Sequence, residues 1–557
     1  MKQLHTERVS RQSPQASTLR QLALVGMSCL VAFMGGCGDG SSDPIARIPA
    51  KDAVTCVVDT TQVIRTVPRG LFGTNLEWFN FADGISAPDG SIRPGWVELA
   101  RAQGVDNIRF PGGTLSDYYH WQDGIGPQEH RPVREHPTDS GKSPNVFGTP
   151  EFLRFCQAVG AQPLITVNAG TGTAAEAAEW VAYCNQKDNP DRQRDGLLQP
   201  VPVHLWEIGN ELYLPGNPTD KSVITVSPET YAERFLAFSA AMRKADPSIK
   251  LMAIGTANSS QVALPYPDWT EIVLARAAPE IDLYAVHNAY FPMTFIQHGV
   301  PTKDLYQSLW AAPEAVARSL TKLSGLLARY EKSRHIEIAI TEWGALFSYE
   351  KTEVDQVKTM GSAVYLARLL QVFLSQPRVT VADYFKFTDR SFMGWIGYDQ
   401  KPKIPYYVIE LFSKHFGSQL VHASVNSPEF DSKAVGIAAA EHGVPELTVA
   451  AALDDTGKKL FINIVNRSWN TIHRIKLDTG GFTPAPTAKT WTISSPGVTD
   501  HNGPDLPGEI NPSLYVEPKL SAGFKGPIAI TTGICSSADT FPIAPFSVLT
   551  IELESHE

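Results

Sequence analysis

The sequence predicts an α/β protein in which a (β/α)8 TIM barrel is followed by a C-terminal β-sandwich domain. Between residues 66 and 418, short apolar runs rich in β-branched residues alternate with longer amphipathic stretches, as in repeated βα units. Over residues 419–557, short alternating strands and Gly/Pro-rich turns replace the helical period. With 557 residues, 43% of them hydrophobic, the chain has enough apolar material for both domains. A doubly wound sheet is the alternative for the first domain.

The N-terminal 50 residues are expected to precede the folded domains. An apolar run over residues 22–34 follows several basic residues and ends in the letters MGGC at 34–37. The run is shorter than the ~20 residues of a membrane-spanning helix. Residues 1–36 therefore resemble a bacterial lipoprotein signal peptide that leaves Cys37 as the lipidated residue, and a plain signal peptide is the alternative. Residues 37–50 are then a flexible tether, and the protein is expected to be exported and lipid-anchored to a bacterial membrane, with the outer membrane or cell surface favoured.

The barrel requires eight strands, and eight candidates recur at intervals. They are expected at residues 71–78, 105–110, 163–168, 203–208, 250–254, 281–287, 335–342 and 379–387. Helix-like segments separate them, for example at residues 174–184, 228–245 and 355–374. Side chains at the C-terminal ends of such strands line the active site of this fold, so polar residues there are the first functional candidates.

The β-sandwich is expected to be discontinuous in sequence. Its clearest strands are residues 460–465, 489–493 and 547–553, and residues 51–65 are expected to add a strand before the barrel begins. Cys56 and Cys535 would then lie in or beside one module, and an exported chain could join them in a disulfide. The sequence does not choose among the pairings of the four remaining cysteines, and four buried thiols are an equal alternative. These cysteines are Cys56, Cys156, Cys184 and Cys535.

Charge and motifs exclude several classes of function. The chain has 48 Lys and Arg against 58 Asp and Glu, a net charge of −10, so it has no basic excess with which to bind nucleic acid. The HExxH, GxxxxGK[ST], GxSxG and CxxC patterns are absent from the sequence. Zinc peptidases of the HExxH type, P-loop enzymes and serine esterases of the GxSxG type are therefore not indicated.

Two glutamates follow apolar strands at the predicted mouth of the barrel. Glu211 ends the letters GNE after residues 203–208, and Glu342 lies in the letters TEWG after residues 335–340. Two facing carboxyl groups can divide the cleavage of a glycosidic bond: one donates a proton to the leaving oxygen and the other attacks the anomeric carbon. The alternative is that either glutamate merely stabilises the first turn of a helix.

Four motifs resemble glycoside hydrolase family 51, the α-L-arabinofuranosidases of clan A. They are RFPGG at 109–113, WQDGIGP at 121–127, WVAYCN at 180–185 and WEIGNE at 206–211. The resemblance implies a retaining mechanism with Glu211 as the acid/base and Glu342 as the nucleophile. It implies no metal and no organic cofactor.

The resemblance also implies a set of substrate-binding residues. These are Glu77, Arg109, Thr114, Asn210, Tyr290 and His287. Asn210 would bind the sugar 2-hydroxyl, Glu77 other hydroxyls, and Tyr290 would hydrogen-bond the nucleophile. His287 is either a substrate contact or a packed residue behind the site. Thr114 stands where many members have asparagine, which alters the expected sugar contacts.

Further along the chain, Thr341 stands where an acidic residue is frequent, and the strand-eight glutamine of some relatives is not identified.

The sequence therefore predicts a retaining glycoside hydrolase that releases α-L-arabinofuranosyl residues from polysaccharides or oligosaccharides. A related retaining β-glucanase or β-xylosidase and a non-catalytic glycan-binding lipoprotein are the alternatives. A carbohydrate is the expected partner, with no nucleic acid and with membrane contact only through the lipid anchor. A homo-oligomer is compatible with the sequence.

Overall fold

The computed structural model describes most of the chain beyond the N-terminal segment. The described residues are 53–135, 141–215, 224–257, 264–294, 300–332, 334–348, 357–388, 393–503 and 520–556. The side chains of residues 290–294 and 346–348 are not described. The predicted signal peptide, the lipidation site at Cys37 and the tether lie outside the described residues.

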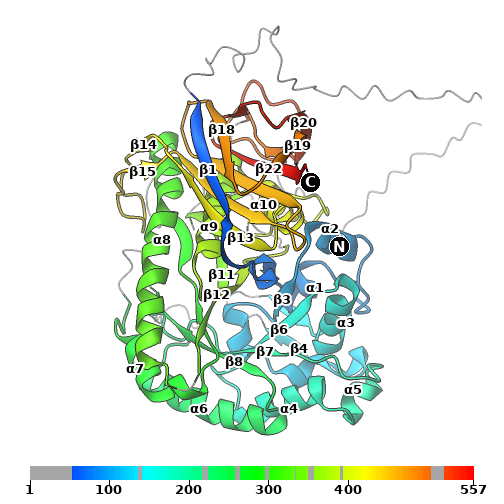
Figure 1. Ribbon diagram of the computed structural model, residues 1–557. Coiled ribbons are helices and arrows are strands. Elements are labelled where there is room, and N and C mark those ends of the chain that lie inside the picture. Colours follow the sequence, from blue (N-terminus) through cyan, green and yellow to red (C-terminus); the bar gives the residue numbers. More distant parts are fainter. Residues whose placement is uncertain are drawn as a thin grey trace, which may run out of the picture. The chain divides into compact units, whose positions relative to one another are not determined.

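Eight parallel strands close into a barrel, which confirms the predicted fold class (Figure 1). In barrel order they are β11 (Glu337–Ser348), β12 (Val379–Tyr384), β2 (Gly73–Asn75), β3 (Asn107–Phe110), β6 (Gln162–Val167), β7 (Leu205–Ile208), β8 (Lys250–Gly255) and β9 (Leu283–Val286). β9 pairs with β11, for example Tyr284 opposite Ile338, and this pairing closes the ring. The doubly wound alternative is therefore wrong, because an open sheet has two unpaired edges. Each predicted strand segment overlaps one of these strands.

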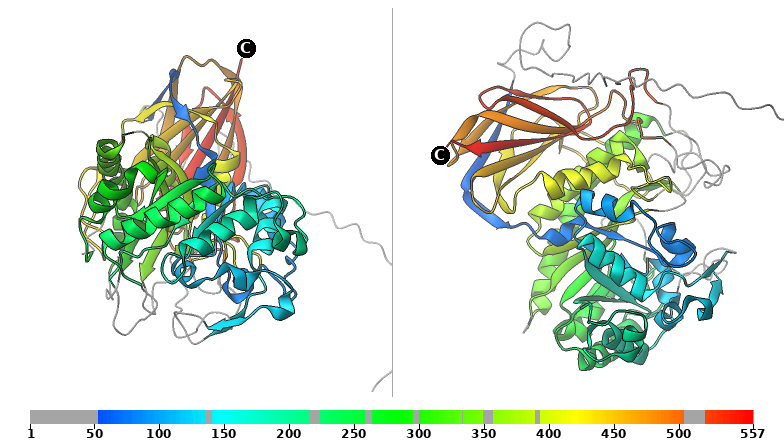
Figure 2. Two further views of the ribbon diagram at one scale, coloured as in Figure 1. Left: turned by 90° about the horizontal axis from the view of Figure 1, so that it is seen from below. Right: turned by 90° about the vertical axis from the view of Figure 1, so that its right-hand side faces the viewer.

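The helices lie around the outside of the barrel (Figure 2). The main ones are α2 (Trp96–Gln103), α3 (Thr149–Val159), α4 (Ala174–Asn185), α6 (Pro228–Ala245), α7 (Trp269–Ala277), α8 (Thr302–Tyr330), α9 (Met360–Ser375) and α10 (Ile404–Lys414). N-cap side chains accept backbone N–H groups at the starts of α4 and α6. The Thr173 hydroxyl accepts the Glu176 N–H at the start of α4, and the Ser227 hydroxyl accepts the Thr230 N–H at the start of α6. Among the described residues, no helix combines the length and apolar composition that crossing a membrane requires.

Short elements fill the connections. They are α1 (Phe79–Asp83), α5 (Pro190–Arg194), the 3-10 turns η3 (Arg69–Phe72), η4 (Thr114–Tyr118), η5 (Trp121–Gly124), η6 (Gln128–His130) and η7 (Ala278–Glu280), and the strands β4 (Val133–Glu135), β5 (Lys142–Pro144), β10 (Ala289–Thr294), β14 (Glu429–Phe430) and β15 (Val444–Pro445). β10 is parallel to the second half of β11, so that Tyr290 lies opposite Gly344.

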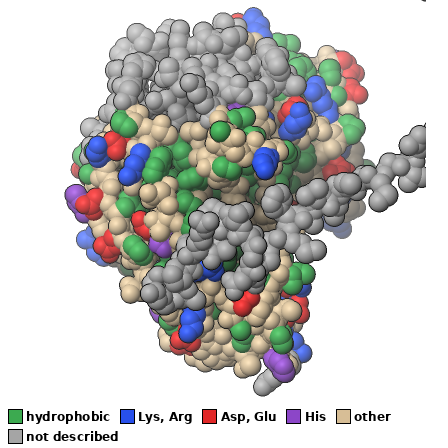
Figure 3. All heavy atoms as spheres, turned by 90° about the horizontal axis from the view of Figure 1, so that it is seen from above, with side chains coloured by type: hydrophobic (Ala, Val, Ile, Leu, Met, Phe, Trp, Pro, Cys, Tyr) green, Lys and Arg blue, Asp and Glu red, His purple; other side chains and the backbone are tan. Residues whose placement is uncertain are grey.

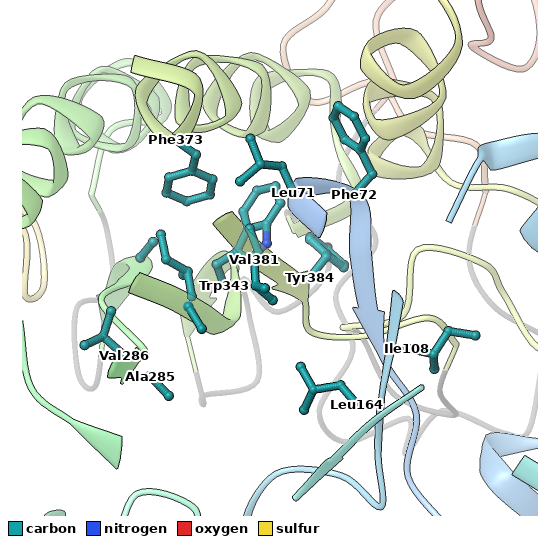
Figure 4. Packing of buried hydrophobic residues seen from close by; sticks show 14 of the residues in the cluster. Leu71, Phe72, Ile108, Leu164, Ala285, Val286, Trp343, Phe373, Val381 and Tyr384 are labelled. Carbon is teal, nitrogen blue, oxygen red and sulfur yellow. The ribbon is translucent and has the colours of Figure 1, made fainter. Parts of the chain in front are cut away.

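Aromatic packing anchors the strand that carries Glu342. Trp343 is fully buried and meets Phe373 of α9 edge to face, with ring centroids 5.2 Å apart (Figure 4). Tyr384 of β12 lies on another side of Trp343 at 5.5 Å and stacks on Trp395 at 4.5 Å. These buried rings pack around the backbone next to Glu342 and hold it in place, so they are core residues.

The second domain is a mixed sheet that includes the strand preceding the barrel. Its order is β20 (Thr531–Ser536), β19 (Pro484–Ile493), β22 (Ser547–Ser555), β17 (Lys459–Asn466), β16 (Leu447–Leu453), β13 (Gln419–Val425), β1 (Val54–Thr66), β18 (His473–Gly480) and β21 (Phe541–Ile543). β1 is antiparallel to β13 and parallel to β18. The sheet encloses its own apolar core, in which Ile475 of β18 and Leu553 of β22 belong to one cluster.

The cysteines do not form the disulfide considered from the sequence. Cys56 is a thiol, buried in β1, and five strands separate β1 from β20, which carries Cys535. Burial raises the pKa of Cys56 to about 12. Cys156 and Cys184 are also buried thiols, in α3 and α4. The suggested pair is wrong because a shared domain does not make two strands neighbours.

Buried polar contacts join the two domains. Gln371 of α9 donates to the side chain of Asn463 in β17 at 3.0 Å. Arg467, just after β17, donates to Glu314 of α8 at 2.8 Å and is fully buried.

On the face shown in Figure 3, acidic and basic side chains are interspersed.

Candidate active site

The candidate residues meet at one end of the barrel. Arg109 lies in β3, Glu211 follows β7, His287 follows β9, and Glu342 lies in β11 at the height where β12 ends. These strands are parallel, so their C-terminal ends share a rim. Residues that are far apart in sequence therefore contact one another there.

The two glutamates face each other across His287. The nearest carboxylate oxygens of Glu211 and Glu342 and one ring nitrogen of His287 all lie within 4.8 Å of one another. The Glu211 side chain is 22% exposed, whereas the Glu342 side chain is 8% exposed. Glu211 has φ +43°, a left-handed conformation that is uncommon for a side chain other than glycine and is found at functional turns.

Arg109 organises the floor of the site. Its Nε donates to Glu207 at 2.6 Å, its Nη1 to Glu342 at 2.9 Å and to Asn75 at 2.8 Å, and its Nη2 to Asn210 at 2.8 Å. Burial lowers the pKa of Arg109, but Glu207 and Glu342 outweigh burial and raise it overall. The guanidinium therefore stays charged, and it holds both the Glu342 carboxylate and the Asn210 amide in place.

Burial and neighbouring charges act on Glu342 in opposite directions. Burial raises the pKa of Glu342, His287 and Arg109 lower it, and Glu211 raises it. The net direction is upward. Glu342 therefore loses its proton at a higher pH than an exposed glutamate does.

His287 lies between the two glutamates and is nearly inaccessible, with a side chain 2% exposed. Its Nδ1 is 2.8 Å from Glu211 Oε1 and 3.8 Å from Glu342 Oε2, and its Nε2 is 2.9 Å from the hydroxyl of Thr341. Burial lowers the pKa of His287, but Glu342 and Glu211 raise it more, so the net direction is upward. His287 is thus directly coupled to both carboxyl groups.

The RFPGG motif requires its two glycines because their backbone lies very close to the side chains of Glu77 and Glu342. A Cβ on Gly112 would lie 2.6 Å from Cγ of Glu77, and Gly112 has φ +125°. A Cβ on Gly113 would lie 2.7 Å from Glu342 Oε1. Both contacts are shorter than carbon side chains tolerate, so the backbone can approach the two carboxyl groups only with glycine at these positions.

The other predicted residues differ in how they join this cluster. Asn210 is buried and bonded to Arg109. Glu77 forms an ion pair with Lys386, which also binds Asp83 at 2.9 Å. Thr114 begins η4 and is half-buried, and no hydrogen bond joins it to the other candidates within the described residues. Tyr290 lies in β10, but its side chain is among those not described.

Several buried polar residues at the site were not singled out from the sequence as site residues. Glu207 and Lys386 make the ion pairs above, and Asp117 accepts backbone N–H groups of Asn210 and Gly170, each at 3.0 Å. Burial raises the pKa of Asp117 to about 7 despite these bonds. The available signal for Glu207 was a charged residue inside an otherwise apolar strand segment.

Glu211, His287 and Glu342 also have donor atoms of the types that divalent cations accept. Glu211 and His287 are already hydrogen-bonded to each other, and Arg109 pairs with Glu342. We therefore assign no metal to the cluster, and the absence of a cofactor stays a prediction.

Comparisons with known proteins agree with this geometry. Residues 101–298 match the family model described as "Alpha-L-arabinofuranosidase 1 domain", and residues 341–526 match "Alpha-L-arabinofuranosidase C-terminal domain". An α-L-arabinofuranosidase structure from Thermotoga maritima, in complex with arabinose, superposes with TM-score 0.74 at 25% identity and covers 90% of this chain and 100% of that one. The chain belongs to glycoside hydrolase family 51. It is therefore a glycoside hydrolase of the retaining type.

The alignments of this family 51 enzyme with its relatives span most of both chains. Alpha-L-arabinofuranosidase C of Emericella nidulans is 26% identical over 468 residues, which are 78% of this chain and 88% of the relative. The intracellular exo-alpha-L-arabinofuranosidase of Bacteroides ovatus is 26% identical over 75% of this chain and 80% of its own. A family 51 structure from Bifidobacterium longum, with TM-score 0.75 and 20% identity over 91% of this chain and 100% of that one, supports the fold.

Proposed function

We propose that this enzyme releases α-L-arabinofuranosyl residues from arabinose-containing polysaccharides or oligosaccharides through a covalent glycosyl-enzyme intermediate. The observation that carries the mechanism is the spacing of Glu211 and Glu342, whose nearest oxygens are within 4.8 Å. Retaining enzymes have carboxyl groups about 5–5.5 Å apart, whereas inverting enzymes leave about 6.5–9.5 Å for a water molecule. The sugar named in this proposal, α-L-arabinofuranose, is taken from the names of the relatives.

In the first step, Glu342 attacks the anomeric carbon while Glu211 donates a proton to the departing oxygen. The roles follow from the surroundings. Glu342 is buried beside the fixed cation of Arg109, which favours an aimed carboxylate. Glu211 is more exposed and touches His287, so it can exchange a proton with the leaving group and later with water.

In the second step, Glu211 removes a proton from water, and the resulting nucleophile displaces Glu342 from the sugar. Two inversions at the anomeric carbon restore the original configuration. Asn210 would bind the sugar 2-hydroxyl, because Arg109 holds its amide oxygen and so orients the amide nitrogen as a donor. The Glu77–Lys386 pair is the further candidate for binding sugar hydroxyls.

Hydrolysis of 4-nitrophenyl α-L-arabinofuranoside tests the proposal, with proton NMR used to follow the configuration of the first-formed sugar. We expect release of the α-anomer and loss of turnover in Glu342→Ala. Glu337→Ala, at the opposite end of the same strand, is the matched control and should stay active. Activity confined to β-glucosides or β-xylosides would replace the proposed sugar specificity. If the parent protein cleaves no furanoside or pyranoside and Glu342→Ala still binds glycan, the catalytic proposal is wrong.

We also propose that the protein is exported and anchored through lipid on Cys37. The support is the basic segment, the apolar run and the small residues before this cysteine. The test is partition of the full chain, produced in a lipoprotein-processing bacterium, between aqueous and detergent phases. The parent should enter the detergent phase and Cys37→Ser should not. Equal partition of the two proteins would contradict lipidation.

A further inference from the structure

Glu207 is a buried charge that does not face the scissile bond in the proposed mechanism. It lies in β7 with a fully buried side chain. Its Oε2 accepts Arg109 Nε at 2.6 Å and Thr166 Oγ1 at 2.7 Å, and its Oε1 accepts Thr341 Oγ1 at 2.6 Å. Three donors, one of them a guanidinium, thus converge on this side chain and fix its position.

The bond to Glu207 determines what Thr341 can do toward His287. A threonine hydroxyl has one hydrogen, and here it is donated to Glu207 Oε1. At its 2.9 Å contact with His287 Nε2, Thr341 Oγ1 can then only accept. Nε2 must therefore carry a proton, which leaves Nδ1 to face Glu211.

The contact between His287 Nδ1 and Glu211 Oε1, at 2.8 Å, requires one further proton. Either Glu211 is a carboxylic acid that donates to a neutral imidazole, or His287 is an imidazolium that donates to a carboxylate. In both forms the pair holds one transferable proton next to the position of the leaving group.

We propose that Glu207, acting through the Thr341 hydroxyl, is a positioning residue that fixes one proton on Nε2 of His287 and thereby keeps a single transferable proton on the Glu211–His287 pair for the acid step. The inference rests on the proposed function of Glu211. It also assigns a role to Thr341, which stands where an acidic residue is frequent in the family. Here Glu207 supplies a negative charge from β7, and Thr341 connects it to the histidine.

Other groups around the pair complete its electrostatic environment. Glu342 faces it from β11 and Arg109 from β3, with opposite charges. Tyr213, just after β7, is buried beside the glutamates, and burial raises its pKa well above the ordinary value, so it stays neutral. These groups are unchanged when only the Thr341 hydroxyl is removed, which makes Thr341 the position to vary.

The kinetic test compares Thr341→Val with Thr341→Ser. Valine has a similar shape but cannot accept from Nε2, whereas serine keeps the hydroxyl. For Thr341→Val we expect kcat/KM on an unactivated alkyl α-L-arabinofuranoside to fall about tenfold, as for loss of one hydrogen bond to a charged group. The 2,4-dinitrophenyl substrate, which needs little acid help, should lose less than about threefold.

The alkaline limb of the pH profile should move with the same variant. Without an acceptor for Nε2–H, the pair binds its proton less tightly, so the limb should move about one pH unit lower in Thr341→Val. Thr341→Ser should restore the profile. Thr448→Val, which removes a buried hydroxyl in β16 that has no hydrogen-bond partner among the described residues, controls for a general effect of the substitution.

A readout independent of turnover separates this inference from the proposed function. In the full chain labelled with 15N-histidine, His287, assigned by its loss in His287→Gln, should show a protonated Nε2, and this signature should disappear in Thr341→Val. If the parent hydrolyses no arabinofuranoside but the signature is present, the proposed function fails and the positioning role stands. A resting His287 with an unprotonated Nε2, or identical pH profiles for valine and serine, overturns the positioning role.

Discussion

Gly113 and Glu342 are so close that a methyl group on Gly113 would lie 2.7 Å from Oε1 of the proposed nucleophile. The backbone of the loop after β3 therefore forms one wall beside Oε1 of Glu342, whereas His287 contacts Oε2. Because Arg109 in the same motif binds the same oxygen at 2.9 Å, one short segment both orients the carboxylate and limits its movement.

Gly113→Ala should therefore reduce catalysis more than stability. The methyl group must displace the Glu342 carboxylate, and a shift of about 1 Å at a reacting atom can cost about 100-fold in rate. The measurement is kcat/KM on the nitrophenyl arabinofuranoside together with a thermal melt. Gly325→Ala in α8, where the added carbon meets no atom within 4 Å, is the control. Unchanged kcat/KM in Gly113→Ala would contradict the tight fit.

Glu211→Ala should lose activity according to the leaving group. General acid catalysis contributes about 10²–10⁴-fold, and substrates with poor leaving groups need it most. Azide ion, which requires no general base, should restore turnover of an activated substrate and give an arabinofuranosyl azide of retained configuration. Glu229→Ala, in the first turn of α6, is a control that should not respond to azide. Equal losses on good and poor leaving groups would argue that Glu211 is not the acid.

The acidic limb of the pH profile should lie above the ordinary glutamate value of 4.5. Burial raises the pKa of Glu342, and attack requires the ionised form, so activity falls as the pH drops through this raised value. The measurement is kcat/KM of the free enzyme from pH 3 to 8. His287 lowers the pKa of Glu342, so His287→Asn should move the limb to higher pH. A shift to lower pH would show that the electrostatic assignment is wrong.

Glu314→Gln should destabilise the contact between the two domains. Burial raises the pKa of Glu314, but Arg368 and Arg467 lower it more, to about 2. The carboxylate thus stabilises the fold above its unfolded pKa of about 4.5, and this contribution is lost as the pH falls toward 2. At pH 7 we expect a loss of about 3 kcal/mol in the free energy of unfolding, the cost of breaking a largely buried ion pair.

Urea unfolding of Glu314→Gln and the parent at pH 7, 5 and 4 measures this effect, and the difference should shrink at the lowest pH. Glu135→Gln removes the exposed pair with Lys142 and should change stability by less than about 1 kcal/mol. A difference between Glu314→Gln and the parent that grows toward acid pH would contradict the sign.

The sequence was informative wherever a local pattern determines a position in the fold. Most barrel strands lie in apolar runs, and Glu211 and Glu342 come at strand ends that must share a rim, so their convergence could be expected. The partners of Glu207, in contrast, could not be predicted from the sequence. Thr166 lies opposite it on β6, but Arg109 and Thr341 come from β3 and β11, and only the tilt and closure of the barrel bring these three to one carboxylate. The ion pair of Lys386 with Glu77 is equally non-local, joining residues 309 apart.

The pairing of β1 with β13 affects how the chain folds while it is being synthesised. Thr66 and Gln419, which are paired at the end of these strands, are 353 residues apart. At ~5–20 residues per second, β1 waits roughly 20 to 70 seconds after emerging from the ribosome before its neighbour exists. During that interval an extended segment with apolar residues such as Val58 and Val63 has no native strand to bind. A nascent chain of this enzyme would thus depend on a chaperone, or on the early folding of the barrel, to keep that edge from associating with other chains.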